Sequence, residues 1–107
     1  MPKKSLESLT ESMFYVLMAF ASGSMCGTDA AGFIERRTCG RIRMGPATLY
    51  TILGKFEKEK LIEEIGVDGR RRTYRITARG AQAYEAELAR LRQCVADAEA
   101  ENGGSNG

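Results

Sequence analysis

The chain of 107 residues contains no histidine and no tryptophan. Histidine is the usual general base near neutral pH and a frequent metal ligand, so its absence removes the simplest catalytic and zinc-binding arrangements. The sequence also has no phosphate-binding glycine loop and no pair of carboxylates flanking a pocket-forming segment. Its three cysteines, Cys26, Cys39 and Cys94, are an odd number without CxxC spacing, which supports neither a disulfide framework nor a metal site. We therefore expect a protein that is not an enzyme and holds no cofactor or metal.

Long apolar runs are missing as well. No segment approaches the roughly 20 apolar residues that a membrane-spanning helix needs, and the start of the chain, MPKKSLESLTES, lacks the apolar stretch of a secretory signal. We expect a cytoplasmic protein without a membrane partner. A chain of this length forms one domain with a modest core, which pairing with a second copy would enlarge.

The charged residues are unevenly distributed, although the formal net charge is only +2. Residues 1–35 carry two lysines against four acids, and residues 80–107 carry two arginines against five acids. Residues 36–79 carry twelve lysines and arginines against five acids, a local charge of +7. Because such an excess attracts a polyanion and the acidic ends repel one, we expect a polyanionic partner to dock on the middle of the chain.

The most informative segment is GPATLYTILGKFEKEK, residues 45–60. Its apolar residues recur with helical spacing and predict a buried stripe of Leu49, Ile52, Leu53 and Phe56. A turn of about 100° per residue places small, hydroxyl and lysine side chains on the opposite face, with Tyr50 at its flank: Ala47, Thr48, Thr51, Gly54, Lys55 and Lys58. Pro46 suits the first helical turn, where its missing amide proton costs nothing. The pattern fits an ordinary solvated surface helix, and it also fits a helix whose polar face enters a narrow polar groove. The neighbouring segments favour the helix that enters a groove.

A first helix is predicted to open at Leu6 or Leu9 and to end near Ser22, with Ser8 or Thr10 as its cap. Its inward stripe consists of Leu9, Met13, Val16, Leu17 and Phe20. Phe14 and Met18 add apolar surface outside that stripe, which indicates a second neighbour such as another subunit.

After a turn bracketed by Gly23 and Gly27, residues 28–37 are predicted to form a second helix. Residues 38–44 follow as a loop or a very short strand that carries Arg41 and Arg43. Two helices joined by a short break are typical of a helix-turn-helix, although every helical bundle contains the same pattern.

A β-hairpin is predicted after residues 45–60. Residues 61–67 and 73–76 alternate apolar and polar side chains, and Asp68-Gly69 between them strongly favours a tight turn. The turn is followed by Arg70, Arg71 and Arg72, which the tip of the hairpin would present together. Three consecutive arginines are usually a solvated run of charge. At the tip of a hairpin that follows a helix with a small, polar face, they are well placed to bind phosphates or to enter a minor groove.

The last predicted helix is capped by Thr77 and runs to about Glu101. Its apolar residues are spaced alternately by four and three positions and form a narrow seam of Tyr84, Leu88, Leu91, Val95 and Ala98. The seam can pack on the first helix of its own chain, but the helix is longer than a domain of this size can cover. We therefore expect a dimer interface made by these residues with Phe14 and Met18.

The predicted order is helix, helix, helix, hairpin, long helix. This fold is mostly α with a two-stranded β-hairpin: a winged helix-turn-helix followed by a long C-terminal dimerisation helix. We assign residues 1–5 to a polar N-terminal tail, residues 6–77 to the winged helix-turn-helix, residues 78–101 to the dimerisation helix and residues 102–107 to a flexible tail.

Several motifs in this order resemble the PadR family of bacterial transcriptional regulators. They are LTE at residues 9–11 with FYVL at 14–17, GPATLY at 45–50, FEKEKLI at 56–62, the arginine-rich hairpin and YRITARG at 74–80. The resemblance covers about residues 6–95 and is closest to the small subfamily with a single C-terminal helix. It implies a homodimeric repressor in which each copy packs that helix against the first helix of its partner.

The resemblance also implies which residues meet DNA. Residues 46–59 correspond to a recognition helix in the major groove, and residues 66–73 to a wing on the backbone or in the minor groove. The candidate DNA-contacting residues are Thr28, Arg43, Pro46, Ala47, Thr48, Tyr50, Thr51, Lys55, Arg70, Arg71 and Arg72. Lys60 stands where relatives commonly have glycine, so a lysine must end the helix without the freedom of glycine at positive φ.

Some members of this family bind planar aromatic compounds on tryptophan, which this chain lacks. A small aromatic or hydrophobic effector would instead have Met13, Phe14, Tyr15 and Cys94 as its candidate pocket, although Phe14 and Tyr15 suit the core better. The resulting prediction is a repressor dimer that binds a pseudo-palindromic duplex. The alternative is a winged helix that binds another protein and has no specific DNA site.

Overall fold

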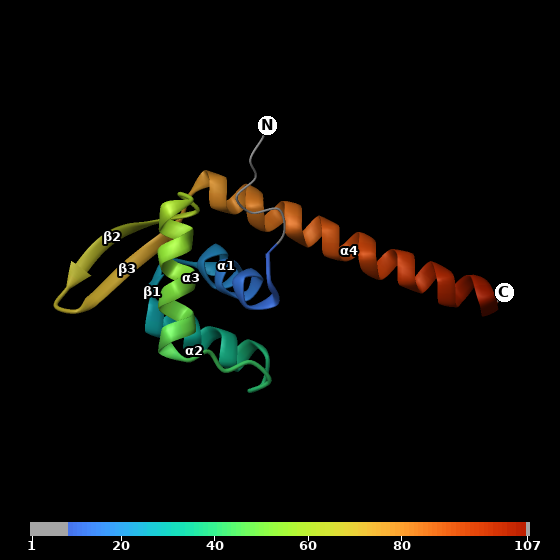
Figure 1. Ribbon diagram of the computed structural model, residues 1–107, viewed down its shortest axis with the longest axis horizontal. Coiled ribbons are helices and arrows are strands. Elements are labelled where there is room, and N and C mark those ends of the chain that lie inside the picture. The colour runs from blue at the N-terminus through green and yellow to red at the C-terminus, as the bar shows by residue number, and fades with distance from the viewer. Residues whose placement is uncertain (1–8, 107) are drawn as a thin grey trace.

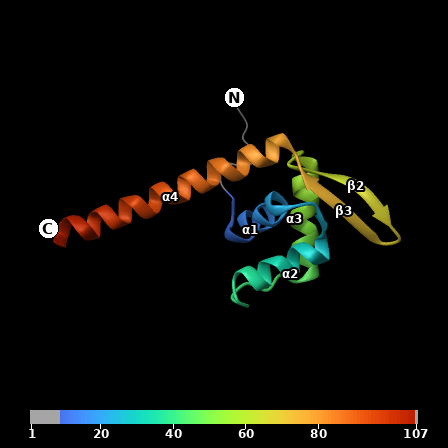
Figure 2. The ribbon, with the colours of Figure 1, turned by 180° about the vertical axis from the view of Figure 1, so that it is seen from behind.

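The computed structural model describes residues 9–106 and contains, in that range, four helices and three strands. They follow the order α1 (Glu11–Ser22), β1 (Met25–Cys26), α2 (Gly27–Arg37), α3 (Pro46–Lys58), β2 (Ile62–Asp68), β3 (Arg71–Ile76) and α4 (Ala78–Asn106). The β2–β3 hairpin projects from one side of the cluster formed by α1, α2 and α3, and α4 extends beyond that cluster on the other side (Figures 1 and 2). This architecture is the mostly helical winged helix-turn-helix that the sequence predicts.

One apolar core joins α1, α2 and α3. The predicted stripe of α3, from Leu49 to Phe56, is fully buried, and so are the equivalent residues of α1 and α2: Met13, Val16, Leu17, Phe20, Ala30 and Ile34. Burial of each large side chain contributes about 1.5–3 kcal/mol relative to an exposed position. These stripes therefore fix which face of each helix points outward.

The start of α1 is set by Thr10, whose Oγ1 accepts a hydrogen bond from the Met13 amide at 3.1 Å. This bond satisfies one of the amides that the first helical turn leaves without a partner. Of the two predicted caps, Ser8 and Thr10, it is thus Thr10 that caps α1. The other possible start at Leu6, the cap at Ser8 and the polar tail at residues 1–5 lie outside the described residues.

The sheet contains a third strand that the sequence analysis did not predict. The segment between Gly23 and Gly27, expected as a turn, includes β1, which pairs antiparallel with β3 through Met25–Tyr74 and Cys26–Thr73. The strand order is β1-β3-β2, so the predicted hairpin is present with one short strand added at its side. A strand of two residues is too short to show an alternating pattern.

The end of α3 has the hydrogen bonds of a Schellman motif. The Lys60 amide donates to the Glu57 carbonyl at 3.0 Å, and the Leu61 amide donates to the Phe56 carbonyl at 2.8 Å. This arrangement needs a left-handed backbone at the residue after the cap, and Lys60 has φ 65°. As expected from the sequence, a lysine adopts a conformation that glycine would adopt without strain.

The final helix is longer than predicted. Thr77 caps it, since its Oγ1 accepts from the Gly80 amide at 3.0 Å. The helix continues past Glu101 to Asn106, so most of residues 102–107, expected as a flexible tail, are helical. Once a helix is established, each added residue gains a backbone hydrogen bond, which here outweighs the low helix propensity of the two glycines before Ser105.

Replacement of Lys60 by glycine is expected to raise the free energy of unfolding by about 0.5–1 kcal/mol, because glycine removes the Cβ strain at positive φ. Urea unfolding followed by circular dichroism would measure the change. Lys55→Gly is the matched control at an exposed position within α3, and it should lower stability by about 1 kcal/mol. If Lys60→Gly destabilised the protein as much as Lys55→Gly, the left-handed conformation would not be a source of strain.

Candidate nucleic-acid interface

The outward face of α3 carries the residues predicted to read DNA. Because Leu49 and Ile52 are buried in the core, the positions between them point to solvent. Pro46, Ala47, Thr48, Tyr50, Thr51 and Lys55 are all exposed, and Tyr50 is 58% exposed. Most of this face has short side chains, so the helix backbone can approach a groove closely.

The wing and the start of α2 enclose a hollow of about 440 Å³ beside α3. It is lined by residues from several elements: Cys26, Gly27, Thr28, Tyr50, Arg70, Arg71, Arg72 and Tyr74. The structure therefore gathers in one place three predicted contacts that are distant in the sequence, namely Thr28 on α2, Tyr50 on α3 and the arginine triplet of the wing. All of these side chains offer hydrogen-bond donors, which suits a phosphate.

Tyr74 connects this hollow with the core. It is 5% exposed and meets the Phe20 ring edge-on, with ring centroids 6.1 Å apart. Burial raises the pKa of Tyr74, and the charge of Glu57 acts in the same direction. The phenol thus keeps its proton at neutral pH and adds no negative charge to a surface rich in arginine.

Three of the predicted DNA-contacting arginines have a carboxylate neighbour. Arg71 lies 4.0 Å from Asp29, Arg72 lies 3.8 Å from Glu64, and Arg43 lies 3.5 Å from Glu35. The arginine side chains are 60–75% exposed, so each pair contributes little to stability. The sequence analysis did not identify these acids, because nothing in the sequence places Asp29 beside the wing.

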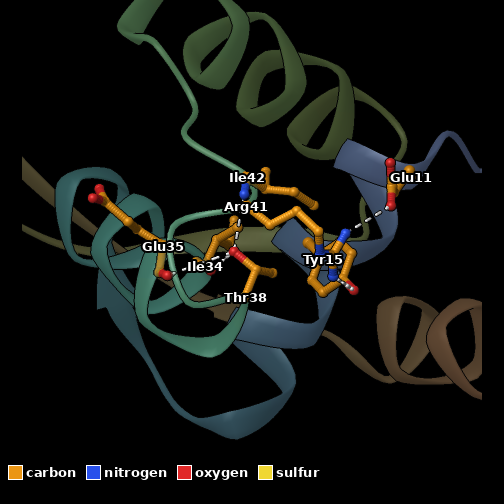
Figure 3. Close-up of polar contacts among 7 residues, drawn as sticks. All are labelled: Glu11, Tyr15, Ile34, Glu35, Thr38, Arg41 and Ile42. Atoms are coloured by element: carbon orange, nitrogen blue, oxygen red, sulfur yellow. Dashed lines mark hydrogen bonds and ion pairs between the residues drawn. The ribbon is translucent and has the colours of Figure 1, made fainter.

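The loop that leads into α3 is held by side chains that the sequence analysis also missed (Figure 3). Buried Thr38 donates from Oγ1 to the Ile34 carbonyl at 2.8 Å and accepts from the Ile42 amide at 3.0 Å. Arg41 donates to the Tyr15 hydroxyl at 3.3 Å and lies 3.5 Å from Glu11, and the bond with Tyr15 is the main reason why the pKa of Arg41 is raised. The loop, which forms no strand, is therefore tied to both α1 and α2.

The predicted dimer seam is only partly covered within one chain. Tyr84 stacks on Phe14 of α1, with ring centroids 5.4 Å apart, so the start of the seam packs inside the subunit. Met18, Leu88 and Leu91 are half-buried. Further along α4, Val95 is 55% exposed and Ala98 is exposed. An apolar end of the seam thus remains on the surface.

The candidate effector residues do not meet at one place within the chain. Phe14 contacts the Tyr15 ring edge-on at 6.0 Å, but Met13 is buried in the core. Cys94 is exposed on α4, about 15 Å along the helix from Tyr84 at about 1.5 Å per residue. A pocket that included Cys94 together with Phe14 would therefore need a second copy of the chain.

Comparison with known proteins assigns the chain to a family. The transcriptional regulator PadR-like family matches residues 16–86, from the middle of α1 to the first half of α4. The chain belongs to this family. The matched region contains the hairpin and all of α2 and α3, so this PadR-like chain has the fold of a PadR-like transcriptional regulator. No significant match was found among curated proteins.

Solved structures agree with the assignment. A transcriptional regulator from Clostridium thermocellum is 25% identical, with a TM-score of 0.69 over 77% of this chain and 83% of that one. RosR from H. salinarum is 18% identical, with a TM-score of 0.70 over 92% and 97% of the two chains. Bacillus subtilis PadR in complex with operator DNA is 18% identical, with a TM-score of 0.65 over 74% and 47%. In residues 9–106 no helix is both long and apolar enough to cross a membrane.

Replacement of Thr38 by valine is expected to lower the free energy of unfolding by about 1–3 kcal/mol. Valine keeps the shape but removes the hydroxyl, which leaves the partly buried Ile42 amide without its acceptor. Thermal and urea unfolding would measure the loss. Thr51→Val, the same change at an exposed position of α3, should stay within about 0.5 kcal/mol of the parent protein. Equal effects at the two positions would mean that the Thr38 hydroxyl does not hold the loop.

Proposed function

We propose that the protein is a homodimeric, sequence-specific DNA-binding regulator that acts as a repressor. Its recognition helix is α3, which enters the major groove, and residues 66–73 form a wing on the backbone or in the minor groove. One observation carries the proposal: Tyr50, at the flank of the polar face of α3, borders the same hollow as the arginines of the wing and Thr28. A surface of this kind offers base-reading and phosphate-binding groups at adjacent places.

The side chains on α3 suit base recognition. Thr48 and Tyr50 carry hydroxyls that can bond phosphates or base edges, and Lys55 can reach a phosphate or a guanine. Ala47 and Thr51 present methyl groups that can contact the methyl group of thymine. Arg43, exposed in the loop just before α3, lies near enough to the helix start to reach a flanking phosphate.

Two copies are needed to read a pseudo-palindromic operator, and the exposed end of the α4 seam supports their association. A two-fold dimer presents two α3 helices to half-sites about one helical turn apart. Val95 and Ala98, which a single chain leaves exposed, would be covered by the partner. A regulator that works on DNA in this way is expected in the cytoplasm.

Solved structures of similar proteins support the proposed function. Bacillus subtilis PadR was solved in complex with operator DNA. For BpsR of Bordetella bronchiseptica, which has a TM-score of 0.68 to this chain, DNA binding is regulated by 6-hydroxynicotinic acid. We infer that a small aromatic or hydrophobic effector also acts on this protein, at a pocket between subunits to which Phe14, Tyr15 and Cys94 contribute; Met13, the fourth candidate, is buried in the core.

Arg71→Ala is expected to weaken binding to every duplex by a similar factor, because Arg71 meets phosphates and no base. The slope of log K against log salt should become shallower by about 1. Fluorescence anisotropy with a promoter duplex and a random duplex, each over a salt series, would measure both effects.

Arg92→Ala, which removes the same charge from the exposed surface of α4, is the control for that experiment and should change neither quantity. Failure of the folded parent protein to bind any duplex at low salt would contradict the proposed function. It would instead favour the alternative of a protein-binding winged helix.

Val95→Asp is expected to shift the protein toward monomers without unfolding it, since Val95 is exposed in one chain and a buried carboxylate would oppose association. Sedimentation at several concentrations would show a weaker dimer, with an unchanged circular dichroism spectrum. Ala89→Asp places the same charge at an exposed position on the opposite side of α4 and should leave the dimer intact. Equal behaviour of the two variants would exclude the seam as the interface.

A further inference from the structure

An ion pair ties the wing to the start of α2. Arg71 Nη1 lies 4.0 Å from Asp29 Oδ2, and both side chains are more than half exposed. Asp29 sits in the first turn of α2, next to Thr28, which lines the hollow together with Arg71. The pairing of Cys26 with Thr73 keeps α2 and the wing at this separation. A carboxylate is thus held beside the most basic part of the molecule.

The Asp29 carboxylate competes with a DNA phosphate for Arg71. Carboxylate and phosphate both offer anionic oxygens that match a guanidinium, so Asp29 and a DNA phosphate are alternative acceptors for Arg71. The pair is long and solvated, which makes it weak and easily exchanged. Before exchange, its attraction holds Arg71 toward Asp29 at the lining of the hollow.

We propose that Asp29 is an internal substitute for a DNA phosphate. It holds Arg71 in the free protein and releases it when a backbone phosphate enters the hollow between the wing and α2. The hollow of about 440 Å³ has room for that group, and Thr28 and Tyr50 line it with further hydroxyl donors. This inference rests on the proposed function, and it assigns to Asp29 a role in how tightly the protein binds DNA.

The exchange lowers the affinity for DNA of any sequence. Since every duplex offers the same phosphate, displacement of Asp29 weakens binding to all sequences by about the same factor. Complexes that depend on phosphate contacts alone then become too weak to persist, and those with base contacts from α3 retain a surplus. Asp29 therefore lowers the occupancy of non-specific DNA at a given protein concentration and leaves the ratio of specific to non-specific affinity unchanged.

Asp29→Asn tests the role, because it removes the charge and nearly keeps the shape. With a random-sequence duplex at low salt, we expect the dissociation constant to fall by about two- to fivefold, the range given by the strength of exposed ion pairs. In the Arg71→Ala background the same change should have a smaller effect, because the partner that Asp29 restrains is gone. Fluorescence anisotropy would measure the four proteins of this cycle.

Glu63→Gln is the matched control. Glu63 also pairs with a hairpin arginine, Arg75, at 2.6 Å, but neither residue lines the hollow. Its effect on the dissociation constant should be smaller than that of Asp29→Asn. Circular dichroism and thermal unfolding would establish that all variants are folded.

The outcomes separate the two proposals. If the parent protein binds the duplex and Asp29→Asn leaves affinity unchanged or weaker, the role of Asp29 is wrong and the proposed function stands. An equal gain with and without Arg71, or an equal gain in Glu63→Gln, likewise overturns the exchange and indicates general charge repulsion. If neither the parent protein nor Asp29→Asn binds duplex DNA, the proposed function fails and this inference fails with it.

Discussion

The contact between the end of α3 and the start of α4 determines how the rest of the molecule is oriented. The Leu61 carbonyl accepts from the Thr77 amide at 2.9 Å, and Thr77 Oγ1 donates to the Lys60 carbonyl at 2.7 Å. Gly80 lies against the same Leu61 carbonyl so closely that a Cβ would collide with it and would lie 2.8 Å from Ile76 Cγ1. Any side chain at Gly80 would force the two helices apart. The candidate recognition helix and the long helix are therefore parts of one rigid unit.

Further contacts extend from this unit around the domain. Tyr84 on α4 stacks on Phe14 of α1, and its neighbour Tyr15 accepts a hydrogen bond from Arg41 in the loop before α3. Thr38 fixes the other side of that loop on α2. Both ends of α3 are thus restrained by residues that also support α4. A change in how α4 packs on Phe14 is therefore expected to reach, through Tyr15 and Arg41, the loop that leads into α3.

The sequence predicted the parts of the structure that depend on local periodicity and left out those that depend on spatial proximity. Helical spacing identified the buried stripe from Leu49 to Phe56, and Asp68-Gly69 located the turn of the wing, where Gly69 has φ 66°. The short strand β1 and the pairing of Arg71 with Asp29 gave no such signal, because they arise only when segments more than forty residues apart meet. The last helix was predicted to end near Glu101 because residues 102–107 contain no core residues, although a helix already formed can continue through such a segment, here to Asn106.

The continuity of α4 ties the position of its exposed apolar end to a count of residues. Between Gly80, which is fixed against Leu61, and Val95, no break in the helix absorbs a change in length. One inserted residue would turn everything beyond it by about 100° and advance it by about 1.5 Å, whereas seven would nearly restore the original face. The length of this stretch is therefore constrained as strictly as its apolar residues, because only insertions of about seven residues keep the seam on one face. In the proposed dimer, the distance between the two α3 helices would therefore depend on the number of residues between Gly80 and Val95.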